Sequence, residues 1–152
     1  PPVPNRVNRM LIALDGSPGA EQALGPALAI CEVTAATPVL LRVVPVSSVF
    51  GPLSHRSGSG ELHRTPGRME LAAARRYLRR VARQIERQSY TVETQVVLNQ
   101  KSIARTIASN AAAYNADLIA LATRKDANKR WLGSIAERVV QFASVPVLVA
   151  TA

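Results

Sequence analysis

Five short runs of apolar or β-branched residues stand out in the hydrophobic pattern of the chain. Most of them lack polar alternation, which is typical of strands whose two faces are both covered by helices. We therefore predict strands over residues 9–14, 38–44, 90–98, 117–123 and 145–150. Pro146 cannot donate a ladder hydrogen bond, which favours either an edge position for the last strand or the start of a strand there.

Apolar residues at helical spacing lie between these strands and predict four helices. In the first helix, Ser17 is a natural N-cap and Pro18 fits the first helical position, and the helix is expected to run to about Ala35. The other three helices are predicted over about 67–89, 102–114 and 134–142.

Strands that alternate with helices at this spacing indicate an α/β fold. The expected architecture is an open, five-stranded, Rossmann-like parallel sheet with helices on both faces. Right-handed crossovers leave few topologies, and in these the first and fourth strands meet at a switch point. Asp15, the end of the second strand near Val43, and the loop 122–134 should therefore meet in one crevice.

The length fits one domain, which we expect over residues 1–152, with a proline-rich lead-in at 1–8 and a long loop at 46–66. His55 and His63 lie in that loop without the Cys, Asp or Glu spacing of a metal site, so no metal is expected.

The single cysteine, Cys31, has apolar helical neighbours and is expected to be buried, in a reducing, cytoplasmic compartment. No run reaches the roughly 18 apolar residues of a membrane helix.

A net charge of +9 favours anionic partners in general. Much of this charge lies in the helix predicted over 67–89, where seven arginines accompany one apolar stripe. Such a helix could bind nucleic acid or anionic lipid, or it could be an amphipathic surface helix with a solvated polar face. Because no aromatic residues interleave the arginines and no recognition motif accompanies them, we favour the second interpretation and expect no nucleic-acid partner.

Three stretches of the chain resemble the universal stress protein family. They are MLIALDGSPGAEQAL at the first strand and helix, NADLIALAT at the fourth strand, and WLGSIAERVVQFASVPVLVA at the end. The resemblance runs from about residue 8 to residue 150. It implies the strand order 3-2-1-4-5 and dimerisation through the last strand, in a family whose members either bind ATP or do not.

The resemblance also implies roles for individual residues. In the members that bind ATP, an aspartate after the first strand contacts the nucleoside, which corresponds to Asp15, and main chain near the end of the second strand meets the base, which corresponds to Val43. The final phosphate contacts fall on Gly133 and Ser134. If the site is retained, its remaining residues are Ala122, Thr123, Arg124 and Ile135.

The phosphate loop departs from the family pattern, in which Gly, two residues, Gly and nine residues precede Gly-Ser or Gly-Thr. Ala122 stands at the first glycine, and Lys125 aligns best with the second, which leaves the loop about two residues short of Gly133. Glycine is favoured in such loops because the backbone takes positive φ and approaches the phosphates closely. The charges of Arg124, Lys125, Lys129 and Arg130 could replace the glycines, but we favour a loop that binds nothing.

We expect a stress-response domain with weak or lost binding of ATP or AMP, and Mg²⁺ only where ATP is bound. No catalytic residue is assigned, because no sequence motif supplies a catalytic partner for Asp15. We therefore expect binding or regulation rather than turnover of the nucleotide. The alternative is a regulatory cytoplasmic domain of a transporter or sensor that responds to a nucleotide second messenger, since the chain starts at Pro1 rather than Met. A homodimer is expected through an edge formed by Val145, Val147, Leu148 and Val149.

Overall fold

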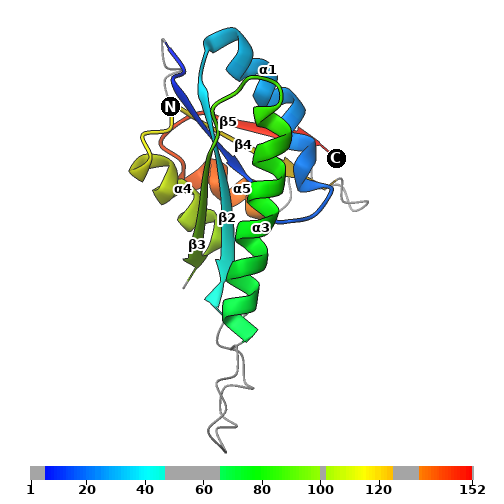
Figure 1. Cartoon of the computed structure of the whole chain (residues 1–152). Helices are drawn as coiled ribbons and strands as arrows, with labels where there is room; N and C mark the ends of the chain where they lie inside the picture. Colours follow the sequence, from blue (N-terminus) through cyan, green and yellow to red (C-terminus); the bar gives the residue numbers. More distant parts are fainter. Residues whose placement is uncertain (1–5, 47–65, 100–101, 125–133, 152) are drawn as a thin grey trace, which may run out of the picture.

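A computed structural model describes residues 6–46, 66–99, 102–124 and 134–151. Its five strands form one parallel sheet with the order β3-β2-β1-β4-β5, which confirms the fold class and the implied strand order (Figure 1). The strands are β1 (Arg9–Ala13), β2 (Thr37–Pro45), β3 (Glu93–Asn99), β4 (Leu118–Thr123) and β5 (Val147–Thr151). The helices are η1 (Ala20–Ala23), α1 (Leu24–Thr34), α3 (Pro66–Glu86), α4 (Ile103–Ala113) and α5 (Ser134–Phe142).

Two hydrophobic cores lie on opposite faces of the sheet because successive side chains of a strand point to opposite sides. On one face Met10, Ile12 and Leu40 are fully buried with residues of α1 and α3. On the other face Leu11 and Leu41 pack with residues of α4 and α5. Both faces are therefore covered, as the unbroken apolar strands predict.

The first helix begins later than predicted. Ser17 Oγ accepts a hydrogen bond from the Ala20 amide at 3.2 Å, but a 3₁₀ turn, η1, follows and α1 starts only at Leu24. Pro26 explains the delay because it has no N–H donor and its ring clashes with the carbonyl four residues earlier. An α-helix tolerates proline only in its first turn, so α1 starts within one turn of Pro26.

The strand boundaries also differ slightly from the predictions. The third strand begins at Glu93, and the fifth begins at Val147, so Val145 lies before it. The missing N–H of Pro146 accounts for the later start of β5, which is an edge strand as expected. The predicted loop at 46–66 and lead-in at 1–8 fall mostly outside the described residues, and no described helix is long and apolar enough to cross a membrane.

Cys31, the single cysteine of the chain, lies in α1 against the sheet. Only 1% of it is exposed, which confirms the predicted burial. Burial raises the pKa of Cys31 to about 11. Because the thiolate is the reactive form, the Cys31 thiol is unreactive near neutral pH.

Candidate functional site

The carboxyl ends of β1, β2 and β4 come together at one edge of the sheet. Ala13 pairs with Leu41, and continuation of this register two residues beyond the end of β1 puts Asp15 level with Val43. Continuation of the register between β1 and β4 puts Thr123 at the same level. The structure thus brings the three predicted strand-end positions to the same edge of the sheet, at the switch point where α/β folds bind ligands.

Asp15 is held by the turn that follows β1. The Leu14 amide donates to the Leu41 carbonyl at 2.9 Å, so the β1–β2 ladder continues almost to Asp15. The Asp15 Oδ1 atom then accepts a hydrogen bond from the Ser17 amide at 2.8 Å, and Ser17 in turn accepts one from Ala20. These short local bonds orient the carboxylate within the turn.

Two arginine side chains reach this turn from neighbouring strands. A Cβ placed on Gly16 would lie 3.7 Å from Cζ of Arg42 in β2, and one placed on Gly19 would lie 3.9 Å from Nε of Arg124, which follows β4. Gly16 has φ +86°, a conformation that favours glycine. The two guanidinium groups therefore approach the Asp15 turn from β2 and from β4.

The surroundings of Asp15 favour its ionised form. Burial alone would raise the pKa of this carboxyl, but the hydrogen bonds from Ser17 and the positive charges of Arg42 and Arg124 outweigh it and lower the pKa below its usual range. Asp15 is therefore a carboxylate at neutral pH. A carboxylate is an acceptor only, so it suits a ligand that presents hydroxyl or amine donors.

A polar cluster between η1 and α3 lies beside the same turn. Arg80 donates to the Glu21 carboxylate at 3.1 Å, and its Cζ lies 5.3 Å from the centre of the Tyr77 ring. Burial, reinforced by the charges of Glu21 and Asp15, raises the pKa of Tyr77. Tyr77 therefore remains a neutral hydroxyl near Asp15.

The other predicted site residues differ in their exposure to solvent. The side chain of Val43 is buried, so only its main chain can contact a ligand. Thr123 is buried as well, whereas Arg124, Ser134 and Ile135 are exposed and Ala122 is half-buried. Gly133, Lys125, Lys129 and Arg130 lie outside the described residues.

Sequence reasoning missed Arg42, Tyr77 and Glu21. Arg42 interrupts the apolar run PVLLRVV, and this single charge on a strand with two buried faces is the signal that could have found it. Tyr77 and Glu21 carried no such signal, because helical spacing places them on partly exposed faces of α3 and η1. Their proximity to Asp15 depends on how these two elements pack.

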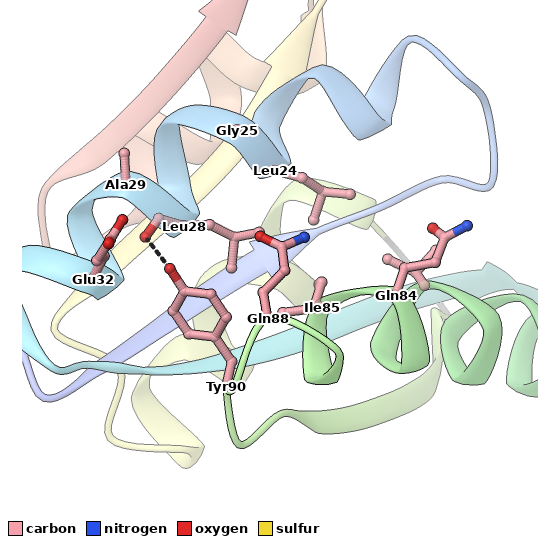
Figure 2. Close-up of a pocket in the computed structure, with 10 residues that line it drawn as sticks. Leu24, Gly25, Leu28, Ala29, Glu32, Gln84, Ile85, Gln88 and Tyr90 are labelled. Carbon is pink, nitrogen blue, oxygen red and sulfur yellow. Dashed lines mark hydrogen bonds between the residues drawn. The ribbon is translucent and has the colours of Figure 1, made fainter.

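A groove lies away from the carboxyl edge of the sheet, between α1 and the carboxyl-terminal half of α3. Figure 2 shows this groove of about 400 Å³, with Leu24, Leu28 and Ile85 among the residues that line it. The Tyr90 hydroxyl closes one end by donating to the Leu28 carbonyl at 3.3 Å. None of the predicted site residues lines this groove, and the described residues contain no group of three metal-binding side chains.

The family model of the universal stress protein family matches residues 6–151, nearly the whole chain. The chain belongs to this family. Membership agrees with the parallel sheet, its strand order and the position of Asp15 after β1. A comparison with curated proteins found no match.

Solved structures of universal stress proteins share the fold. One from Lactobacillus plantarum is 22% identical, with a TM-score of 0.69 over 96% of this chain and 99% of that one. A universal stress protein in complex with cAMP is 17% identical, with a TM-score of 0.67 over 97% and 98%. One from Archaeoglobus fulgidus in complex with dAMP is 18% identical, with a TM-score of 0.65 over 94% and 96%. At these identities the likeness establishes the fold.

Proposed function

We propose that this universal stress protein domain binds an adenine nucleotide at the carboxyl edge of its sheet. In this proposal the Asp15 carboxylate accepts hydrogen bonds from the ribose hydroxyls, and the main chain at Val43 meets the adenine base. The observation that carries the proposal is the ionised, pre-oriented Asp15 level with Val43 at the switch point. The solved relatives with cAMP and dAMP support an adenylate as the ligand class.

Binding should be weak because the phosphate loop lacks the family's glycines. Ala122 lies in β4 without a positive φ, whereas Lys125 replaces a glycine whose backbone would take positive φ, and a strained non-glycine conformation costs about 1–3 kcal/mol per residue. A cost of that size weakens binding by roughly tenfold or more. Arg42 and Arg124 can offset part of this loss, because guanidinium groups bind phosphate oxygens in bidentate geometry.

We further propose that the domain acts by binding or regulation in a cytoplasmic stress response, with no turnover of the nucleotide. The described residues at the carboxyl edge of the sheet include Asp15, a carboxylate of low pKa and therefore a poor general base. Mg²⁺ would enter only with ATP, because the described residues provide no set of carboxylates of their own. The unit in solution is proposed to be a homodimer through the edge of β5.

Calorimetric titration of ATP and AMP into the wild-type chain, Asp15→Asn and Glu32→Gln tests the nucleotide site. Asp15→Asn should weaken binding at least tenfold, whereas Glu32→Gln makes the same change of charge at an exposed position of α1 and should leave affinity unchanged. Equal affinities in all three proteins would place the nucleotide elsewhere. A titration with cAMP that gave much tighter binding than ATP or AMP would favour the second candidate, a regulatory domain that responds to a nucleotide second messenger.

A further inference from the structure

Helix α3 carries more than half of the net charge of the protein. Seven arginines lie on it or directly after it, against two glutamates, which gives +5 of the total of +9. All seven are exposed, whereas Leu78, Val81 and Ile85 on the opposite side are buried against the sheet. We call this exposed surface the arginine face; its members are Arg68, Arg75, Arg76, Arg79, Arg80, Arg83 and Arg87.

The arginine face is almost unneutralised. Within the part of the chain that the structure describes, only Arg80 of these seven pairs with a carboxylate, that of Glu21. Six pairs of arginines stand three or four residues apart on the helix, where like charges destabilise it. The arginines can therefore interact with an anionic partner, and binding of that partner would reduce the repulsion between them.

The sequence alone favours a solvated polar face with no nucleic-acid partner. Because the arginine face is almost unneutralised, we propose instead that it is a docking surface for the sugar-phosphate backbone of a nucleic-acid duplex, bound without regard to sequence. Arginine binds phosphate oxygens through two parallel N–H donors, so it suits a row of phosphates. Arg76, Arg80, Arg83 and Arg87 follow one another at intervals of three or four residues. They therefore form a single row about 16 Å long, since each helical residue adds about 1.5 Å.

The composition of the face distinguishes a duplex from other anionic partners. Single strands are bound by stacking bases on aromatic rings, and the only aromatic residue of α3, Tyr77, is half-buried beside Arg80. Protein interfaces have an apolar centre, and Met69 is the only large apolar side chain of α3 that is exposed. A bilayer takes up the apolar side of an amphipathic helix, but that side of α3 is already packed on the sheet. The phosphate backbone of a duplex requires none of these features.

The proposal does not depend on the nucleotide site. Asp15, Val43 and Arg124 lie at the carboxyl edge of the sheet, whereas Arg76, Arg83 and Arg87 lie on the solvent side of α3. A chain that failed to bind AMP could still bind a duplex, and the reverse also holds.

Fluorescence anisotropy with a labelled 24-base-pair DNA of arbitrary sequence tests the arginine face. Wild-type protein should bind at low salt, with an affinity that falls steeply as salt is added. The variant Arg76→Gln/Arg83→Gln/Arg87→Gln should bind at least tenfold more weakly, and the slope of log affinity against log salt should become less steep by up to about 2.7, from about 0.9 per lost phosphate contact. Glutamine is used because its helix propensity is close to that of arginine.

A matched control removes the same charge from other exposed surfaces. Arg6→Gln/Arg105→Gln/Arg138→Gln also lowers the net charge from +9 to +6 and should bind the duplex nearly as well as wild type. The variant Arg76→Lys/Arg83→Lys/Arg87→Lys keeps the charge and should retain binding within about threefold, which would show that substitution at these positions does not by itself abolish binding through misfolding. An absence of wild-type binding at low salt, an equal loss in the control, or tighter binding to phosphatidylserine vesicles than to DNA would overturn the proposal.

Discussion

Arg42 shows what one residue contributes to the surroundings of Asp15. Its neighbours in β2 are apolar and buried, yet its guanidinium extends to the backbone of Gly16 and helps to keep Asp15 ionised. Substitution of Arg42 should therefore raise the pKa of Asp15 without disrupting the core.

We expect Arg42→Gln to raise the pKa of Asp15 towards its usual value, because a favourable charge is removed while burial remains. Titration of the carboxyl carbon by NMR measures this pKa directly. A lowered carboxyl pKa contributes stability above the usual value and loses it as the pH falls through the folded value. Arg42→Gln should therefore reduce the free energy of unfolding at neutral pH. An Asp15 pKa equal in the two proteins would contradict the coupling.

The composition of the site could be predicted only in part. The positions of Asp15 and Val43 could be predicted because they lie at the carboxyl ends of strands that the hydrophobic pattern locates, and the strands' parallel order brings these ends together. Arg42 and Tyr77 could not be assigned in this way, since their positions near Asp15 depend on side-chain reach and helix packing. Gly133 lies outside the described residues, so its predicted phosphate contact stays a prediction.

At the scale of elements, periodicity predicts existence and type better than boundaries. The apolar stripe of α3 and the short runs of β1, β2 and β4 were located correctly because burial imposes their pattern. The predicted start of the first helix was wrong, because one residue, Pro26, determines where α1 can begin. The later start of β5 has the same kind of cause in Pro146.

The repulsion along α3 leads to a prediction about stability. Arg79 stands three or four residues from Arg75, Arg76 and Arg83, so Arg79→Glu converts three repulsive pairs into attractive ones. We expect the free energy of unfolding in urea at low salt to rise by about 1 kcal/mol. Arg79→Gln, which only removes the repulsion, should give about half of that. A loss of stability in Arg79→Glu would mean that another contact of Arg79 outweighs the repulsion.

The whole molecule has an open sheet edge at β5. The Pro146 carbonyl accepts from the Ile119 amide at 3.0 Å, so the backbone groups of the alternate residues Val147 and Val149 face away from β4. The side chains of β5 from Val147 to Ala150 are only half-buried, and Val140 and Phe142 of α5 are exposed nearby in the sequence. An exposed edge of this kind is normally covered by a partner.

We predict a dimer at tens of micromolar, measured by sedimentation equilibrium. Val149→Pro should weaken it at least tenfold, because proline removes an outward N–H, and it should leave the monomer folded, since that N–H makes no bond within the sheet. A wild-type mass of one chain would contradict the predicted dimer. A dimer unaffected by Val149→Pro would place the interface away from β5.

The most direct test of the nucleotide site is an AMP titration of the ¹⁵N-labelled chain followed by amide NMR. The nucleotide is anionic, so it could also associate with the arginine face, and only a residue-resolved method separates the two surfaces. We predict shifts concentrated at Asp15–Ala20, Val43 and Val44, Thr123 and Arg124, and Ser134, saturating with a dissociation constant between about 10 µM and 1 mM. Shifts confined to α3, or no shifts at millimolar AMP, would contradict a nucleotide site at the carboxyl edge of the sheet.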